Sequence, residues 1–182
     1  MKRLLVLVLS LIMIMTAAQV LGETAVREIQ FVTEEGVTLV FEQIDATSCA
    51  FVEMVGSPVH LIIPSEIEGL RVTSIGNGAC FDISSLQTVV VPEGVTDIGI
   101  QALSRCPALW EITLPSTLRT VGRVAFQYDY SLCRLVFPMG LEELGEDIVS
   151  DCVNLIQVIL PADLHASIQF PTAHALRCTA PT

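Results

Sequence analysis

The chain has 182 residues, of which 52% are hydrophobic and 16% are charged. This composition excludes an intrinsically disordered chain, because enough apolar side chains are present to form a core. Twenty Asp and Glu against nine Lys and Arg give a net charge of −11, which disfavours nucleic acid and anionic membrane surfaces as partners.

Residues 1–22 have the layout of a secretory signal peptide, in which Lys2 and Arg3 precede a nearly unbroken apolar run over 4–18. We expect cleavage after Gly22. An uncleaved anchor helix is the alternative, although the run is shorter than the ~20 apolar residues that a membrane span needs. Cleavage would leave seven Arg against 20 acidic residues, a net charge of −13 (7 − 20). We therefore expect a secreted or cell-surface protein with no stable membrane span after signal cleavage.

Residues 23–58 are expected to form an N-terminal cap. Two strand-like stretches, VTLVFEQI and CAFVEMVG, flank the turn-rich DATS, which predicts a β-hairpin over 37–56. A hairpin in this place would cover the apolar end of whatever follows it.

Residues 59–161 repeat with a period of 23, as the leucine positions show (109 − 86 = 23). Three columns carry the repeat: Leu86, Leu109, Leu132 and Leu155; Pro92, Pro115, Pro138 and Pro161; Gly76, Gly99, Gly122 and Gly145. Pro64 lies 28 residues before Pro92, so the first unit holds five extra residues. One unit buries too few side chains to offset its ordering entropy, so the units must stack.

Each unit reads as one coil of a β-rich solenoid. Apolar and polar residues alternate before each Pro, which indicates a short strand with one buried face. We expect Gly122 to supply a backbone turn that a side chain would obstruct, and Phe126 to fill the interior. The predicted strands form one parallel ladder in register, at about 60–63, 87–91, 110–114, 133–137 and 156–160. Residues 162–182 lose the pattern and are expected to be a C-terminal cap or a frayed tail.

Three stretches of this repeat, IPSEIEGLRVTSIGNGACF, VPEGVTDIGIQALSRCPAL and LPSTLRTVGRVAF, resemble the BspA-like leucine-rich repeat. The resemblance covers about residues 59–161. It implies a right-handed leucine-rich-repeat solenoid in a secreted or surface protein that acts in adhesion or binds host or matrix proteins. The chain departs from the usual unit at two columns: Cys80, Leu103 and Val149 stand where Phe is usual, and Ile83 and Asp129 stand where Cys is usual.

Six cysteines in an exported chain raise the question of disulfides. Cys106 and Cys152 share a column but are two coils apart, roughly 10 Å at the strand spacing of a ladder, so they should not bond each other. We expect both to be buried, inert thiols and Cys80 to be interior. Cys49 could reach Cys80 if the hairpin folds over the first coil, and the states of Cys133 and Cys178 stay open.

We find no motif that predicts catalysis, a metal site or a cofactor. The chain has no G-x-S-x-G, H-E-x-x-H or Walker sequence. His60, His165 and His174 are scattered, and the acidic stretch GEDIVSDC lacks EF-hand spacing. We therefore expect a protein that is not an enzyme.

The candidate binding site is the outward face of the ladder, the concave sheet of the solenoid. Trp110 and Arg134 are the residue types that interfaces favour; Trp110 could instead shield an edge, and Glu111 and Arg134 could form a cross-strand pair. The face comprises Thr88, Val90, Trp110, Glu111, Thr113, Arg134, Val136, Gln157 and Ile159.

The leading hypothesis is a secreted binding module that recognises an extracellular protein or glycan through this face. The first alternative is a structural or surface-layer component that self-associates. The second is a hydrolytic enzyme, which would need a cluster of catalytic side chains that the repeat columns do not supply.

Overall fold

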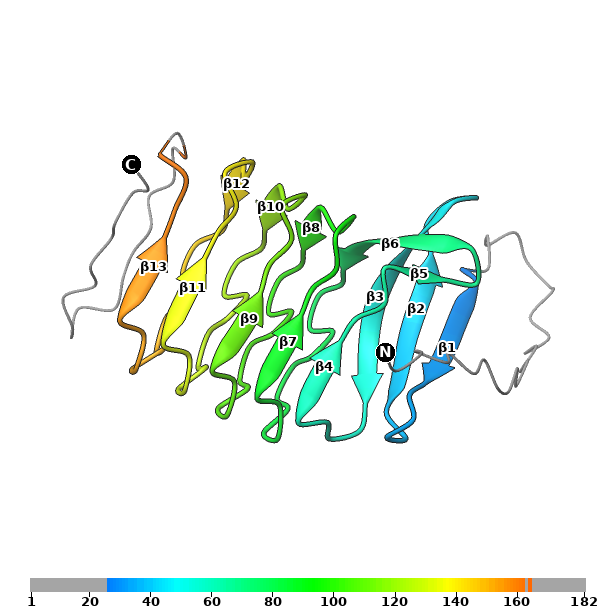
Figure 1. Cartoon of the computed structure of the whole chain (residues 1–182), viewed down its shortest axis with the longest axis horizontal. Helices are drawn as coiled ribbons and strands as arrows, with labels where there is room; N and C mark the ends of the chain where they lie inside the picture. Colours follow the sequence, from blue (N-terminus) through cyan, green and yellow to red (C-terminus); the bar gives the residue numbers. More distant parts are fainter. Residues whose placement is uncertain (1–25, 163, 165–182) are drawn as a thin grey trace, which may run out of the picture.

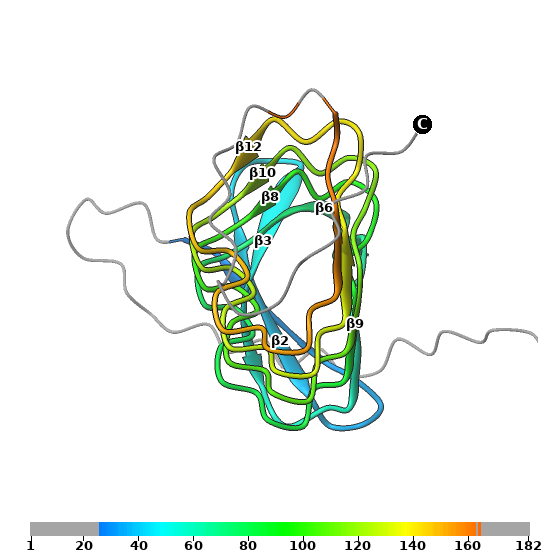
Figure 2. The same cartoon turned by 90° about the vertical axis from the view of Figure 1, so that its left-hand side faces the viewer.

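The computed structural model describes residues 26–162 and residue 164. Within this part the chain forms thirteen strands and no helix, and it winds into coils that stack along the long axis of the molecule (Figure 1). Viewed along that axis, the coils superpose as a flattened ring with strands on two opposite walls (Figure 2). The predicted signal peptide at 1–22, and nearly all of the predicted cap or tail at 162–182, lie outside the described residues.

One wall, which we call the sheet wall, consists of the strands that the repeat predicted. Strands β4, β7 and β9 pair in parallel, as do β11 and β13, and every register follows the repeat. Each strand lies inside its predicted range, so the parallel solenoid is confirmed. The bounds are β4 (His60–Ile62), β7 (Thr88–Val90), β9 (Glu111–Thr113), β11 (Arg134–Val136) and β13 (Gln157–Ile159).

The prediction of one continuous sheet is wrong between β9 and β11. The Val91 N–H donates to the Thr113 carbonyl at 3.0 Å, and the Trp110 N–H donates to the Gln87 carbonyl at 3.0 Å. The equivalent groups one coil further, the N–H groups of Leu114 and Cys133, donate to no backbone carbonyl within the described part of the chain. Strands β9 and β11 still lie side by side (Figure 1). The coils stay stacked there because the opposite wall is bonded across the same two coils.

The opposite wall, which we call the spine wall, was not predicted. It consists of β6 (Leu70–Ile75), β8 (Asp97–Ile98), β10 (Thr120–Val121) and β12 (Glu143–Leu144), paired in parallel without interruption. Strands β8, β10 and β12 have two residues each, and so short a strand has no alternation of apolar and polar residues that could reveal it.

The glycine column excludes side chains, as predicted, but it does so without a left-handed turn. Gly122 does not have a positive φ, so it does not supply a left-handed turn. A Cβ atom at Gly122 would instead lie 2.7 Å from the carbonyl carbon of Gly99 and from the nitrogen of Ile100. Gly145 approaches Gly122 in the same way. The column is glycine because successive coils pass too close together for a side chain.

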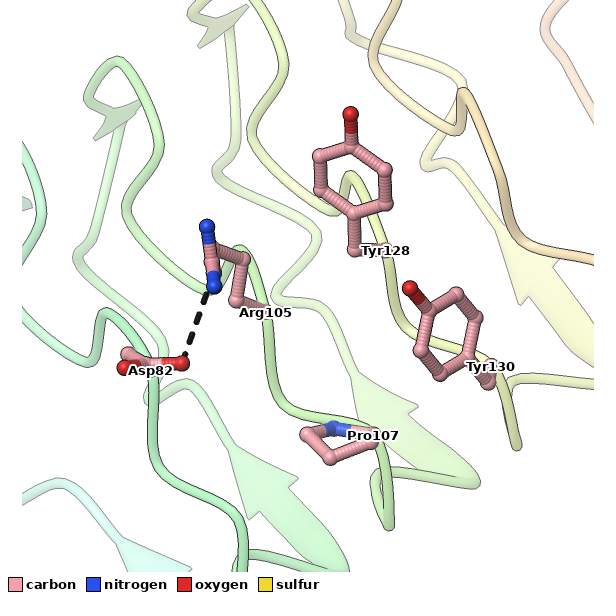
Figure 3. Close-up of a pocket in the computed structure, with 5 residues that line it drawn as sticks. All are labelled: Asp82, Arg105, Pro107, Tyr128 and Tyr130. Carbon is pink, nitrogen blue, oxygen red and sulfur yellow. Dashed lines mark ion pairs between the residues drawn. The ribbon is translucent and has the colours of Figure 1, made fainter.

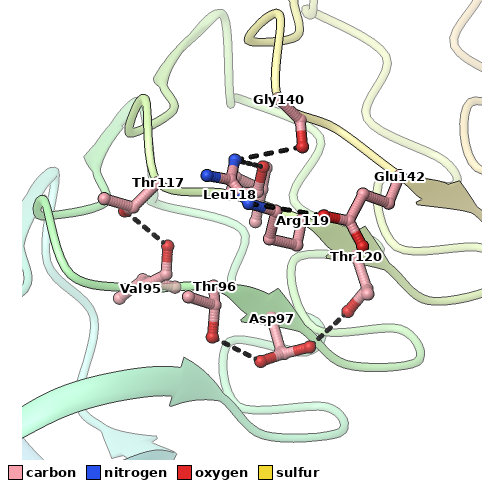
Figure 4. Close-up of polar contacts among 9 residues, drawn as sticks. All are labelled: Val95, Thr96, Asp97, Thr117, Leu118, Arg119, Thr120, Gly140 and Glu142. Carbon is pink, nitrogen blue, oxygen red and sulfur yellow. Dashed lines mark hydrogen bonds and ion pairs between the residues drawn. The ribbon is translucent and has the colours of Figure 1, made fainter. Parts of the chain in front are cut away.

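Polar contacts from coil to coil reinforce the spine wall (Figure 4). The Thr120 hydroxyl donates to Asp97 across a 23-residue step. Arg119 donates to the Gly140 carbonyl at 3.0 Å and forms an ion pair with Glu142 at 3.6 Å. Each contact joins one coil to the next, so the spine wall is held by side chains as well as by its ladder.

The N-terminal cap contains the predicted hairpin and a further strand. Strands β2 (Thr38–Gln43) and β3 (Ser48–Val55) pair antiparallel, β1 (Glu28–Val32) pairs with β2, and β3 pairs in parallel with β6. The cap therefore continues the spine wall. The five extra residues of the first unit form a second hairpin, β5 (Glu66–Ile67) with β6, which turns at Glu68 and Gly69 in the left-handed region.

The interior is filled by the repeat columns, and the leucine column and Phe126 are fully buried. Cys106 and Cys152 are buried as predicted, and burial raises the pKa of each thiol to about 12. Their Sγ atoms lie 3.1 Å from the Cys80 carbonyl oxygen and 2.9 Å from that of Phe126. Cys80 is also buried, and the thiols of Cys49, Cys80, Cys106, Cys133 and Cys152 are all unpaired. Cys178 lies outside the described residues.

Asp129 occupies the same column, between Cys106 and Cys152. Its side chain is fully buried, and its Oδ1 accepts a hydrogen bond from the Cys106 N–H at 2.8 Å. Its Oδ2 has no partner within the described residues. Burial away from water raises the pKa of this carboxyl to about 9, so Asp129 is protonated at neutral pH.

Candidate binding site

All nine residues of the predicted binding face lie on the sheet wall. Eight belong to β7, β9, β11 and β13, and Trp110 directly precedes β9. The ladder places Thr88 beside Glu111 and Val90 beside Thr113. In the other half it places Arg134 beside Gln157 and Val136 beside Ile159. The opening between β9 and β11 separates the two halves.

The cross-strand pair between Glu111 and Arg134 is not formed. Within the described residues the ion pairs are Arg27–Glu68, Arg105–Asp82 and Arg119–Glu142. Glu111 and Arg134 lie on either side of the opening in the sheet wall, and both are exposed. They therefore remain available to a partner.

Exposed apolar side chains run along the sheet wall, and we call them the apolar band. Trp110 is 49% exposed, so its side chain is not buried against an edge of the sheet. Ile62 and Ile156 are exposed by 72% and 71%, more than Trp110, Val90 or Val136, yet neither was included in the predicted face. Their columns could have identified them, because Ile62 pairs with Val90 and Ile156 follows Trp110 and Cys133 at 23-residue steps. The band comprises Ile62, Val90, Trp110, Val136 and Ile156.

A second feature lies on the loops that lead from the spine wall back to the sheet wall, and we call it the loop hollow. It has a volume of about 230 Å³ and is lined by Asp82, Arg105, Pro107, Tyr128 and Tyr130 (Figure 3). Asp82, Arg105 and Tyr128 occupy one repeat position, and all three have left-handed backbones with φ of 62°, 63° and 63°. Pro107 and Tyr130 share another position, two residues later.

Charged and aromatic groups face one another across the loop hollow. The Arg105 Nε lies 3.4 Å from the Asp82 Oδ1, and the guanidinium stands over the Phe81 ring at 5.6 Å. The rings of Tyr128 and Tyr130 meet edge to face, with centroids 6.3 Å apart. The repeat does not reveal this site because its residues differ from coil to coil, although their shared 23-residue spacing would have grouped them.

Other parts of the described chain offer little chemistry. A second hollow of about 250 Å³ lies between the β1–β2 turn and β4, and its lining includes Glu34, Glu35 and His60. No group of three or more His, Cys, Asp or Glu side chains is gathered as metal ligands among the residues that the structure describes. In the same part of the chain, no helix has the length and apolarity that a membrane span requires.

Comparisons with solved structures agree with this architecture. The T. pallidum leucine-rich repeat protein is 24% identical, with a TM-score of 0.55 over 73% of this chain and 68% of that one. A leucine-rich repeat protein from Bacteroides capillosus is 23% identical, with a TM-score of 0.54 over 58% of this chain and 82% of that one. The pneumococcal vaccine antigen PcpA is 23% identical, with a TM-score of 0.53, but only 25% of its length is covered, against 58% of this chain. These likenesses show the fold.

Sequence comparison identifies the family. No curated protein matches the chain significantly. The family model described as "BspA type Leucine rich repeat region" matches residues 59–169 with six copies of its repeat. That match spans more than half of the chain and includes every coil described above. The chain therefore belongs to the BspA-type leucine-rich repeat family.

Proposed function

We propose that the protein is an exported, non-enzymatic binding module that recognises an extracellular protein through the sheet wall. The family's usual role in protein interaction supports the general class of function. The observation that carries the proposal is the apolar band, a row of exposed large side chains on short strands that the coil stack holds in place.

The composition of the sheet wall supports a protein as the partner. Protein interfaces combine an apolar centre with a polar rim, and Trp and Arg contribute a large share of their binding energy. Here Trp110 and Val136 supply the apolar part, and Glu111 and Arg134 supply opposite charges that have no ion-pair partner within the described residues. A partner that covers the band would remove apolar surface from water and could pair both charges.

Export and the lack of catalysis are parts of the same proposal. Export rests on the basic, apolar and small-residue pattern of residues 1–22. The groups in the described chain whose pKa values are strongly raised are Cys80, Cys106, Asp129 and Cys152. All four are packed in the interior between the walls, which supports a structural role for them.

A capture experiment with mucus and extracellular-matrix extracts tests the proposal. The test variant is Trp110→Ala combined with Arg134→Glu, which removes the largest side chain of the band and reverses a charge beside it. We expect the wild-type protein to retain a matrix protein that the test variant loses. The matched control is Val153→Ala combined with Arg123→Glu, which makes the same kinds of change at exposed positions away from the sheet wall. Equal retention by the test variant would refute recognition through this face.

Self-association is the competing function, because an apolar band also fits a second copy of the chain. Sedimentation of the wild-type protein distinguishes the two. Binding to another protein predicts a monomer. An oligomer that the Trp110→Ala, Arg134→Glu variant dissociates would favour the structural role instead.

A further inference from the structure

We propose that the loop hollow is a second binding site, separate from the sheet wall, and that it takes a neutral saccharide. This proposal goes beyond the proposed function and does not depend on it. It rests on the pairing of an aromatic side with a charged side around a space of about 230 Å³ (Figure 3).

The aromatic side offers surfaces for an apolar ligand face. Tyr130 is 45% exposed, and its ring meets that of Tyr128 at an interplanar angle of 71°. Pro107 adds a rigid apolar ring to the lining of the hollow. A sugar ring has one face that consists mainly of C–H groups, which stacks on an aromatic face, and an edge of hydroxyl groups that still needs hydrogen-bond partners.

The charged side supplies those partners. Arg105 uses its Nε for Asp82, and its terminal N–H groups have no hydrogen-bond partner within the described residues. The phenol hydroxyls of Tyr128 and Tyr130 likewise make no hydrogen bond there. A sugar hydroxyl can accept from a guanidinium N–H and donate to a carboxylate at the same time, so an adjacent Arg and Asp suit neighbouring hydroxyls.

The charge around the hollow favours a neutral ligand over an anionic one. Arg105 is the only cation in its column, and Asp82 already neutralises it at 3.4 Å. Asp151 continues the column one coil beyond Tyr128, and the whole chain carries a net charge of −11. A sialylated or sulfated sugar would therefore meet repulsion that a neutral one avoids.

The same groups disfavour a proline-rich peptide, which is the other common occupant of aromatic surfaces. Proline has no N–H group and no hydroxyl group, so such a peptide would cover Asp82 without donating to it. Although Arg105 stays paired with Asp82, covering the carboxylate without offering it a further hydrogen bond removes hydration that is not replaced, which is costly. The hollow also spans only three coils, which is short for an extended peptide.

Saturation-transfer NMR and titration with the full chain test the proposal. The probes are the methyl glycosides of glucose, galactose and N-acetylglucosamine, together with N-acetylneuraminic acid and a proline-rich decapeptide. We expect a neutral glycoside to bind and the acidic sugar and the peptide not to bind. Absence of neutral-glycoside binding at tens of millimolar, or preference for either of the other probes, would overturn the proposal.

Four variants locate the site. Tyr130→Ala should weaken binding about tenfold, as expected for the loss of about 1.4 kcal/mol of stacking. Arg105→Gly should also weaken it, and it relieves a left-handed backbone, so lost folding cannot explain the result. Val153→Ala, which changes the residue at the repeat position of Tyr130 one coil further, and Trp110→Ala on the sheet wall should change affinity less than twofold. Binding that survives Tyr130→Ala, or that is lost with Trp110→Ala, would contradict the assignment.

Discussion

The two walls of the solenoid are built from the same repeat yet differ in how they are held together. The spine wall is bonded without a break from the cap through β6, β8, β10 and β12. The sheet wall is interrupted between β9 and β11. Close glycine contacts and polar side chains connect the coils on the spine wall, whereas large apolar side chains are exposed on the sheet wall. We infer from this comparison that the spine wall contributes more to stability, and that the exposed side chains of the sheet wall are available for the proposed binding.

The largest effect on stability is expected at the glycine column of the spine wall. Gly122→Ala would place a Cβ atom 2.7 Å from backbone atoms of the preceding coil, which cannot move aside as a flexible side chain could. We expect a loss of about 2–3 kcal/mol in the free energy of unfolding, measured with urea.

Gly76→Ala is the matched control, since it lies in the same column beside the cap and its Cβ atom would meet the nearest atom at 3.2 Å. We expect Gly76→Ala to lower the free energy of unfolding by clearly less than Gly122→Ala does. An equal cost for both substitutions would mean that close approach of the coils is not the reason for glycine.

An effect that depends on pH is expected at Asp129 between the walls. Its pKa is about 9 when folded and 3.8 in the reference state, so the folded protein holds a proton that the unfolded chain releases. Stability should therefore fall as pH rises from about 4 to about 9.

Asp129→Asn removes this titration and keeps an acceptor for the Cys106 N–H. We expect the variant to be more stable than wild type at pH 8 and to gain less at pH 5, as measured by urea unfolding at both values. If the difference in the free energy of unfolding between variant and wild type does not grow with pH, Asp129 is not a buried, protonated acid.

The smallest effect on stability is expected on the sheet wall. Trp110 and Arg134 are both exposed, so the double variant Trp110→Ala, Arg134→Glu should lose less than ~1 kcal/mol. Thermal unfolding compared with wild type checks this. A loss as large as that of Gly122→Ala would mean that the sheet wall also holds the coils together.

The sequence predicted what the coils have in common. Leucine and proline columns located all five strands of the sheet wall, and the DATS turn located the β2–β3 hairpin. The spine wall was missed because three of its four strands have only two residues, too few to show a pattern. The glycine column was correctly expected to exclude side chains, but it was assigned to a turn because close approach between coils is a tertiary property. Strand β1 and the opening between β9 and β11 have no counterpart in the repeat.

For the candidate sites too, only the features that recur from coil to coil could be predicted. The predicted face lies on one wall because each of its columns repeats at 23 residues, but Ile62 and Ile156 were left out although they are more exposed than Val90. The loop hollow was missed because Asp82, Arg105 and Tyr128 occupy the same repeat position but have side chains of different chemistry. A repeat reveals the scaffold through what recurs, whereas binding residues are the ones that differ between coils.

Hydrogen exchange followed by NMR tests most directly the claim that the spine wall holds the coils while the sheet wall is left open. The amides of Glu142 and Gly145 donate to the carbonyls of Arg119 and Val121, each at 2.8 Å. The amides of Leu114 and Cys133 have no such acceptor within the described residues. We predict that Leu114 and Cys133 exchange much faster than Glu142 and Gly145, and faster than their own equivalents Val91 and Trp110. Equal protection of all six amides would contradict the account.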